Sequence, residues 1–482
     1  MDQPSLPAAE EPFTDPEGQS ERHQVVMTDE RAVRRAVKAA ALGNAMEWFD
    51  FCIYSYMAAT LGHVFFPSSN QTVQLLASFA TFAVAFIVRP FGAVVFGTMG
   101  DRIGRKKVLA LTILLMAFGT FAIGLLPPYA AIGFWAPVLL IFFRLVQGFS
   151  TGGEYCGAAT FIAEYAPDRR RGHYCSFLEL GTLVGYVCGA GVVTALTAVV
   201  GTAGMADWGW RIPFLVAGPL GLVGLYLRLR LEETPAFLKL EADSRRAANG
   251  THVERVSATS GFAHIFRHHL PTVVLCIGLV AAYNIVHYML LSYMPTYLSS
   301  ELGYSKTYGL VILIVVMICL MLVINPVGRL SDRVGRRSVL MTGMVGFFFL
   351  SLPSFLLIGQ GGFLAITGGL LLGLSLVCLL GTMPAALPAL FPTQVRYGGL
   401  AISYNISASS FAGSTPLVAT ALIGATGNTL VPAYYAMTAA LVGMVAVLCM
   451  KETARQPLDG SPPAVTSGDG ERVPASTSSR RT

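Results

Sequence analysis

The chain has 482 residues, of which 54% are hydrophobic and only 12% are charged. Soluble domains carry about 25% Asp, Glu, Lys and Arg, so this composition excludes a cytosolic enzyme and a secreted disulfide scaffold. The net charge of +6 does not indicate a nucleic-acid-binding module, because no basic patch falls on a soluble domain. The eight cysteines form no CxxC or Cys/His cluster, so we expect buried thiols and no metal site.

Twelve apolar runs follow a polar first segment. Residues 1–38 form a tail that we expect to be disordered, because its start is polar and rich in Pro and Glu. Each run has about 20 residues or more, which is long enough for a helix to cross a bilayer core of about 30 Å. The predicted membrane helices are, in chain order, 40–62, 73–97, 108–126, 135–163, 173–200, 211–228, 270–298, 307–327, 338–358, 362–390, 397–423 and 431–450.

A polar stretch at 229–269 divides these helices into two sets of six. We predict an N-terminal half over 39–228, a central loop over 229–269, a C-terminal half over 270–451 and a disordered tail over 452–482. Of the 33 Lys and Arg residues, all fall in the tails or in the loops after even-numbered helices except Arg89, Arg144, Arg211 and Lys306. Since basic loops remain inside the cell, we predict a multi-pass plasma-membrane protein with both termini in the cytoplasm.

The loops after helices 2 and 8 carry one motif at identical spacing. The first copy comprises Gly97, Asp101, Arg102, Gly104 and Arg105, and the second comprises Gly328, Asp332, Arg333, Gly335 and Arg336. Two further landmarks recur in both halves in the same order: Pro167 and Arg171 with Pro392 and Arg396, and Glu233-Thr234 with Glu452-Thr453. These repeats predict a duplicated six-helix unit, which in transporters places the substrate between the halves near the middle of the membrane.

The repeated loops also suggest a gate. Their glycines allow helices to approach closely, and Asp101 or Asp332 can pair with Arg or face the positive N-terminus of a helix in the other half. We therefore predict that both copies of the motif hold the cytoplasmic side closed. The alternative is a pair of basic loops that only fix topology, which would need Lys and Arg but no repeated Asp and Gly.

This pair of loops resembles the signature of the major facilitator superfamily. Within it, the stretches GNAMEWFDF (43–51), LGHVFFP (61–67) and QGFSTGGEY (147–155) resemble the metabolite–proton symporter family. The branch of that family that carries proline and glycine betaine is similar in four further stretches, DWGWRIPF (207–214), LEETPAF (231–237), YMLLSYMP (288–295) and MPAALPALFPT (383–393). The resemblance runs from about residue 31 to 459.

The resemblance implies an all-α membrane protein, with twelve transmembrane helices in two pseudo-symmetric halves. It also implies proton-coupled import of a zwitterionic compatible solute, such as proline or glycine betaine, by alternating access. Relatives that carry citrate or dicarboxylates share the first-helix motif, so the alternative is proton symport of a di- or tricarboxylate such as citrate or 2-oxoglutarate. A non-transporting sensor would carry an added signalling domain, and a drug–proton antiporter fits the similarity to uptake systems less well.

Ionisable residues are costly inside a membrane, and those in the predicted spans concentrate in the first half. Glu47 and Asp50 share a face of helix 1, Glu154 lies on helix 4, and Glu179 on helix 5 is a further acid to which we assign no role. Burial favours the neutral carboxyl and a nearby guanidinium favours the charged one, so a carboxyl between them can carry a proton. We predict proton coupling by Asp50, Glu47 and then Glu154; the alternative is a permanent salt bridge to one of the buried arginines.

Solute-binding candidates come from three chemical types. Arg144 and Arg89 offer the bidentate fork that a carboxylate needs, although Arg89 lies nearer the cytoplasmic end and could serve the gate instead. Aromatic rings suit a quaternary ammonium, or else pack between helices: Trp48, Tyr54, Tyr155 and Tyr186. Polar contacts are expected from Gln147 and, in the second half, from Asn284, Tyr288, Tyr293 and Asn405, with His287 as a packing residue or a proton relay.

The expected partners are therefore a small solute, the proton and the lipid bilayer, without nucleic acid. We expect no enzymatic activity, no cofactor and no metal, since the proton gradient would supply the energy. We also expect a monomer.

Overall fold

The computed structural model describes residues 26–28, 30–103, 105–229, 268–393, 395–459 and 464–466. These residues are helical, apart from short connections and two three-residue strands, β1 (Val26–Thr28) and β2 (Ala464–Thr466), which pair in parallel. The helices of the first half are α1 (Glu30–Tyr56), α2 (Ala58–Phe65), α3 (Gln71–Ile87), α4 (Arg89–Ile103), α5 (Arg105–Leu125), α6 (Tyr129–Ile132), α7 (Trp135–Ser150), η1 (Thr151–Gly153), α8 (Glu154–Tyr165), η2 (Asp168–Arg170), α9 (Arg171–Gly204), η3 (Met205–Gly209) and α10 (Arg211–Leu229).

The second half repeats this pattern of long, interrupted helices. Its elements are α13 (Leu270–Tyr288), η4 (Met289–Tyr293), α14 (Met294–Thr296), η5 (Tyr297–Glu301), α15 (Lys306–Val334), α16 (Arg336–Gln360), α17 (Gly362–Leu380), α18 (Met383–Ala386), η6 (Pro388–Leu390), α19 (Arg396–Ser407), η7 (Ala408–Ala412), α20 (Ser414–Thr426) and α21 (Val431–Cys449). The predicted central loop, 229–269, lies outside the described residues except at its two ends.

The helices agree with the twelve predicted spans. Among the described residues, nine helices are long and apolar enough to cross a membrane, and two shorter apolar helices cover Ala110–Leu125 and Arg211–Tyr226. The remaining span is formed by α1 and α2, and α1 starts with the charged sequence ERAVRR and carries Glu47 and Asp50. The all-α fold with twelve spans is therefore confirmed.

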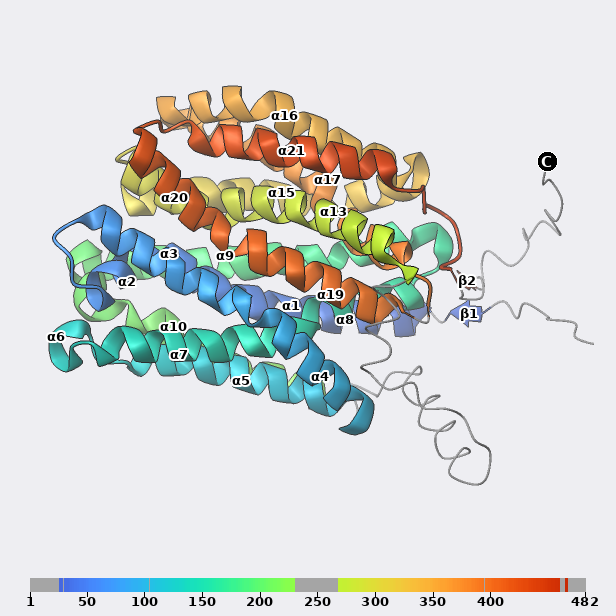
Figure 1. Ribbon diagram of the computed structural model, residues 1–482, viewed down its shortest axis with the longest axis horizontal. Helices are drawn as coiled ribbons and strands as arrows, with labels where there is room; N and C mark the ends of the chain where they lie inside the picture. The colour runs from blue at the N-terminus through green and yellow to red at the C-terminus, as the bar shows by residue number, and fades with distance from the viewer. Residues whose placement is uncertain are drawn as a thin grey trace, which may run out of the picture.

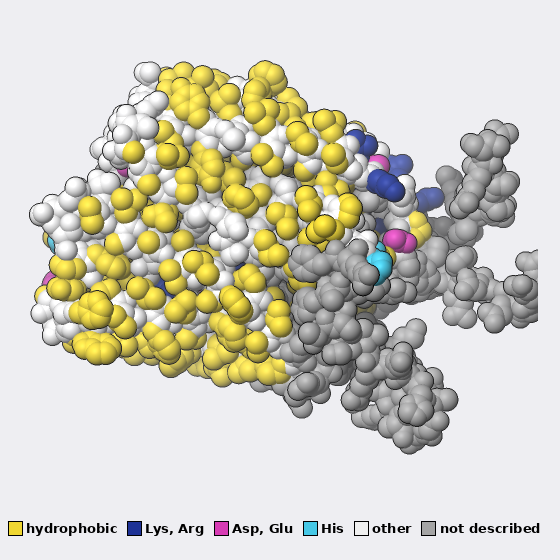
Figure 2. Space-filling view, viewed as in Figure 1, with side chains coloured by type: hydrophobic (Ala, Val, Ile, Leu, Met, Phe, Trp, Pro, Cys, Tyr) yellow, Lys and Arg dark blue, Asp and Glu magenta, His cyan; other side chains and the backbone are white. Residues whose placement is uncertain are grey.

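The helices lie roughly parallel in one bundle (Figure 1). The visible side of the bundle is covered by hydrophobic side chains, and basic side chains gather at the end where β1 and β2 lie (Figure 2). We call this the basic end; it includes the exposed residues Arg170, Arg333 and Lys451. A hydrophobic belt along the helices, with basic side chains gathered at one end, is the distribution expected of a protein in a bilayer.

Several spans are interrupted where the sequence weakens helical hydrogen bonding. Pro90, which lacks an N–H, is the second residue of α4, directly after the break that ends α3 at Ile87. Gly152 and Gly153 lie in the 3-10 turn between α7 and α8. Pro295 lies between two π-helical turns in the span that begins with α13. The first two interruptions fall near the middle of their spans, whereas Pro295 lies close to the end of its span at Glu301.

The segments outside the bundle are shorter than the tails predicted from the sequence. Helix α1 begins at Glu30, so the last nine residues of the predicted tail 1–38 are helical. After α21, residues 452–459 pack against the bundle, because the Glu452 carboxylate accepts hydrogen bonds from the backbone N–H groups of Arg336, Arg337, Thr453 and Ala454. The prediction of a disordered tail starting at 452 is therefore wrong for these residues.

The two halves touch at both ends of the bundle. At the basic end, Gly172 and Gly328 lie so close that a Cβ on Gly172 would be 2.6 Å from the Gly328 carbonyl oxygen. Toward the opposite end, the Ser55 and Ser292 hydroxyl oxygens are 2.6 Å apart. Between these contacts, the buried residues of both halves form one continuous cluster. The structure is therefore closed on both sides of its centre.

Candidate functional site

A chain of hydrogen bonds joins the predicted proton residue Asp50 to the predicted solute residue Arg144. Asp50 Oδ2 accepts from the Thr120 hydroxyl at 3.1 Å. Gln147 Nε2 donates to the same hydroxyl at 2.6 Å, and Gln147 Oε1 accepts from Arg144 Nη1 at 2.8 Å. All four side chains are buried. A change in the protonation of the Asp50 carboxyl can therefore affect the Arg144 guanidinium through the side chains of Thr120 and Gln147, although Asp50 and Arg144 are not in direct contact.

The helices explain this geometry. Arg144 and Gln147 lie one turn apart on α7, so their side chains meet on one face. Thr120 comes from α5, which packs against α7, and Asp50 comes from α1, which contacts α5. Thr120 was not a sequence candidate, because a single threonine in an apolar helix carries no signal of its own.

The three predicted proton residues lie close together. Glu47, Asp50 and Glu154 are buried, and all three line a small cavity between α1, α5, α8 and α10. The other lining residues are glycine or apolar: Gly43, Met46, Ile113, Met116, Ala117, Leu220 and Gly221. The cavity therefore lies within the first half, beside the hydrogen-bonded chain that leads to Arg144.

Two buried guanidinium groups share one aromatic ring. The Phe51 ring centroid lies 4.7 Å from the Arg89 guanidinium carbon and 5.4 Å from that of Arg144. Arg144 also lies 4.2 Å from the Tyr54 ring and donates to the Phe82 carbonyl at 3.3 Å. Among the described residues, Arg89 Nε, Arg89 Nη2 and Arg144 Nε have no hydrogen-bond partner. Such donors are costly to leave buried, and a carboxylate would satisfy them.

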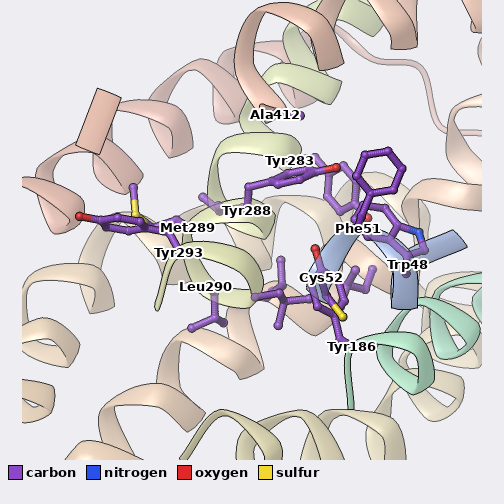
Figure 3. Packing of buried hydrophobic residues seen from close by; sticks show 14 of the residues in the cluster. Trp48, Phe51, Cys52, Tyr186, Tyr283, Tyr288, Met289, Leu290, Tyr293 and Ala412 are labelled. Carbon is purple, nitrogen blue, oxygen red and sulfur yellow. The ribbon is translucent and has the colours of Figure 1, made fainter. Parts of the chain in front are cut away.

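Buried aromatic rings from both halves meet near Phe51, the ring that borders both arginines (Figure 3). Trp48 stacks on Tyr186 at 5.2 Å between centroids and lies 5.1 Å from His287 and 5.8 Å from Tyr288. We call Trp48, Tyr186, His287 and Tyr288 the central aromatic cluster. Phe51 is 6.4 Å from Trp48, so it connects this cluster to the two guanidinium groups. The arrangement brings together aromatic candidates that the sequence places on helices 1, 5 and 7.

Glu179 occupies the border between the halves. Its Oε1 accepts hydrogen bonds from Tyr155 at 2.7 Å and from Tyr283 at 2.9 Å, and the Tyr283 hydroxyl lies 3.1 Å from His287 Nδ1. Tyr155 belongs to the first half and Tyr283 to the second. The sequence showed Glu179 as an acid within a span, but the partners that give it a place in the site come from distant helices.

The remaining predicted solute residues divide between packing and interface positions. Asn284 is buried, and its Nδ2 has no hydrogen-bond partner among the described residues. Asn405 Nδ2 donates to the Gly152 carbonyl at 2.5 Å and thereby joins the two halves. Tyr293 stacks edge-on against Phe79 of the first half. Asn284 thus keeps a buried donor that a ligand could use, as Trp48 does with its Nε1, which also has no partner among the described residues.

The second copy of the loop motif contacts the first half. Asp332 accepts hydrogen bonds from the backbone N–H groups of Gly172 at 2.7 Å and His173 at 2.9 Å, at the start of α9. Arg336 lies 4.0 Å from the same carboxylate. Gly335 has φ of +109°, a conformation that favours glycine, at the turn between α15 and α16. Arg333 is exposed.

The first copy of the motif is described only in part. The backbones of Gly97, Asp101 and Arg102 belong to α4, and that of Arg105 starts α5. Their side chains and all of Gly104 lie outside the described residues. The roles of both copies as gates remain predictions.

Comparison with known proteins identifies the family. Residues 36–464 match the family described as sugar (and other) transporter. The chain is 48% identical over 447 residues to the glycine betaine/proline/ectoine/pipecolic acid transporter OusA of Dickeya dadantii (strain 3937) and to the proline/betaine transporter of Escherichia coli (strain K12), covering 92% of this chain and 88% of each relative. It is 44% identical to the ectoine/proline transporter ProP of Corynebacterium glutamicum, over 90% of this chain and 87% of that one.

Solved structures support the fold. The proton:xylose symporter XylE of the major facilitator superfamily, bound to 6-bromo-6-deoxy-D-glucose, superposes with a TM-score of 0.70 at 19% identity, covering 88% of this chain and 97% of that one. A partially occluded inward-open form of XylE from E. coli superposes with a TM-score of 0.68 at 18% identity, covering 88% and 99%. The chain therefore belongs to the sugar (and other) transporter family, and it is a multi-pass membrane transporter with the major facilitator fold.

Proposed function

We propose that this transporter is a proton-coupled symporter that imports a zwitterionic compatible solute, such as proline or glycine betaine, across the plasma membrane. The names of its relatives, at 44–48% identity over most of the chain, support this substrate class. In this proposal the proton gradient supplies the energy, no cofactor takes part, and the protein works as a monomer.

One observation carries the proposal: Phe51 lies next to both buried guanidinium groups and also next to Trp48. A zwitterion such as glycine betaine has a carboxylate at one end and a quaternary ammonium at the other. Guanidinium groups suit the first end, and the faces of Trp48 and Tyr288 suit the second. The site thus offers complementary chemistry for both ends of one small molecule.

Proton coupling is assigned to Asp50. Its hydrogen-bonded path through Thr120 and Gln147 ends on Arg144, so protonation of Asp50 changes which groups the path can donate to and accept from. Glu47 and Glu154 lie in the same cavity and supply a route for the proton. We infer that protonation of the Asp50 carboxyl and binding of the solute carboxylate to Arg144 are linked through this hydrogen-bonded path.

The proposal includes an orientation, with both termini in the cytoplasm. Basic residues gather at the end of the bundle that holds β1 and β2, and the positive-inside rule supports a cytoplasmic location for that end. The contacts of Asp332 with the start of α9 then close the cytoplasmic side, and the Ser55–Ser292 contact closes the outer side. Import requires that these two sets of contacts break in turn, with the motif loops acting as the inner gate.

Transport into proteoliposomes tests the proposal. Purified protein is reconstituted, a pH gradient is imposed, and uptake of labelled glycine betaine is measured with and without a protonophore. We expect accumulation that the protonophore abolishes and that excess proline or ectoine inhibits.

The second candidate, a di- or tricarboxylate symporter, is favoured by the presence of two buried arginines. The same assay separates the two candidates. Inhibition by citrate or 2-oxoglutarate, with no effect of proline, would replace our proposal with this one.

A further inference from the structure

Glu179 is a buried carboxylate whose hydrogen-bond donors are neutral. The side chain is fully buried, and both tyrosine hydroxyls donate to the same oxygen, Oε1. Its second oxygen, Oε2, is buried and has no hydrogen-bond partner among the described residues. No ion pair to Glu179 is found among them either. A buried carboxylate with a free acceptor is costly unless a donor or a cation joins it.

The surroundings of Glu179 are those of a cation site. Tyr155 stacks on Tyr404 at 4.7 Å, and Tyr283 packs edge-on against His287, which belongs to the central aromatic cluster. A carboxylate bordered by aromatic faces attracts an ammonium group by charge and by cation–π interaction. On its other border, the same cluster lies next to Phe51, whose ring is 6.4 Å from Trp48 and next to the guanidinium groups of Arg89 and Arg144. Positive and negative poles therefore flank the same aromatic cluster.

We propose that Glu179, with the hydroxyl groups of Tyr155 and Tyr283, binds the cationic nitrogen of the solute and thereby makes the site select zwitterions over plain carboxylates. This inference rests on the proposed function, and it adds a negatively charged group to the binding site, opposite the two arginines. Tyr283 comes from the second half, while Glu179 and Tyr155 come from the first. Its hydrogen bond to Glu179 crosses the interface, so separation of the halves frees the carboxylate for an incoming solute.

Counterflow in proteoliposomes without a pH gradient tests this pole, because it measures solute binding and exchange and needs no net proton movement. We compare glycine betaine with its carbon isostere, 3,3-dimethylbutanoate, in which a neutral carbon replaces the quaternary nitrogen and the carboxylate is kept. In the Glu179→Gln variant, the KM for glycine betaine should rise at least tenfold, whereas inhibition by the isostere should stay the same or improve. Glu179→Asp should give a smaller loss, and Tyr283→Phe should shift the preference in the same direction. Glu301→Gln, a change of an acid near the outer end, is the matched control and should behave as the wild type.

Each outcome is decisive. An unchanged ratio of betaine to isostere affinity in Glu179→Gln would overturn the inference, and so would normal counterflow combined with lost gradient-driven accumulation, since that pattern marks a proton carrier. If Glu179→Gln fails to fold, the ratio in Glu179→Asp and Tyr283→Phe decides instead. Absence of betaine counterflow in the wild type would contradict the proposed function itself and is thereby distinguished from failure of this inference.

Discussion

Arg144 has surroundings that call for a carboxylate ligand. It is fully buried, and its described partners are a neutral amide, a backbone carbonyl and three aromatic rings. A charged group taken out of water needs strong compensation, and these neutral partners supply only part of it. A solute carboxylate would complete its coordination during each transport cycle.

Replacing Arg144 with Lys should therefore raise the KM for solute at least tenfold. Lysine keeps the positive charge but loses the planar fork that grips both carboxylate oxygens. Initial rates of uptake over a range of glycine betaine concentrations measure the effect. Arg211→Lys is the control, because Arg211 lies against Trp210, away from the site. Equal KM values for Arg144→Lys and wild type would exclude Arg144 from solute binding.

Helical spacing was enough to predict from the sequence that some site residues lie on the same face of a helix. Glu47, Asp50 and Tyr54 on one face of helix 1 were predictable, because residues three and four apart share a face. The Asp50–Thr120 and Glu179–Tyr283 contacts were not, because each joins helices that are distant in sequence and whose rotation depends on packing. The sequence therefore predicts which residues face the interior better than which residues meet there.

At the scale of elements, residues 452–459 fasten the basic end of the second half. The carboxylate of Glu452 caps the start of α16 through the N–H groups of Arg336 and Arg337. Arg171 of the first half donates to the Gln456 carbonyl at 2.9 Å, so the same segment reaches across the interface. The repeated Glu-Thr pair of the sequence thus has a structural role in its second copy.

The Glu452→Gln variant should lose about 1 kcal/mol of stability at neutral pH, the usual worth of a helix cap. Burial alone would raise the pKa of Glu452, but the N–H groups of Arg336, Ala454, Arg337 and Thr453 together outweigh it and lower the pKa below its ordinary value. A lowered pKa gives stability that is present above the ordinary value and is lost as the pH falls through the folded-state value.

Thermal unfolding of the detergent-solubilised protein from pH 7 to pH 3 measures this difference. The advantage of the wild type over Glu452→Gln should shrink as the pH falls. A difference that stays constant over this range would show that the charge of Glu452 contributes nothing to the cap.

Element boundaries were harder to predict than element number. Length and hydropathy are sufficient to count spans, since lipid requires complete helices. They do not show that α1 starts at Glu30 or that α7 gives way to α8 at Gly152-Gly153, since glycine and proline permit a break but packing decides whether it forms. The predicted start of the C-terminal tail was wrong for a similar reason, because two of the four backbone N–H groups that hold Glu452 belong to α16, which is distant in sequence.

At the scale of the molecule, two sets of contacts between the halves enclose the candidate site. The basic end is joined by Asp332 with α9 and by an ion pair between Arg396 and Glu164 at 2.8 Å. The opposite side is joined by Ser55 with Ser292 and by Tyr56 with the Leu291 carbonyl. The duplication predicted from the loop motif explains why two rigid halves can exchange one set of contacts for the other.

A disulfide between the halves should stop this exchange. Ser55 and Ser292 place their hydroxyl oxygens 2.6 Å apart, so the double variant Ser55→Cys, Ser292→Cys should form a bond that holds the outer side closed. Uptake should fall to background after oxidation and recover after reduction, while each single variant remains active under both conditions. Full uptake by the cross-linked protein would show that this interface does not need to open.

Coupling of solute import to proton movement is the central claim, and solute-induced proton flux tests it most directly. A pH-sensitive dye inside proteoliposomes reports lumenal pH when glycine betaine is added outside, with no imposed gradient. The wild type should acidify the lumen, and Asp50→Asn should take up solute down its gradient without acidification, because the first group of the Asp50–Thr120–Gln147–Arg144 chain can no longer change its charge. Solute entry into wild-type vesicles with no change in lumenal pH would contradict the account.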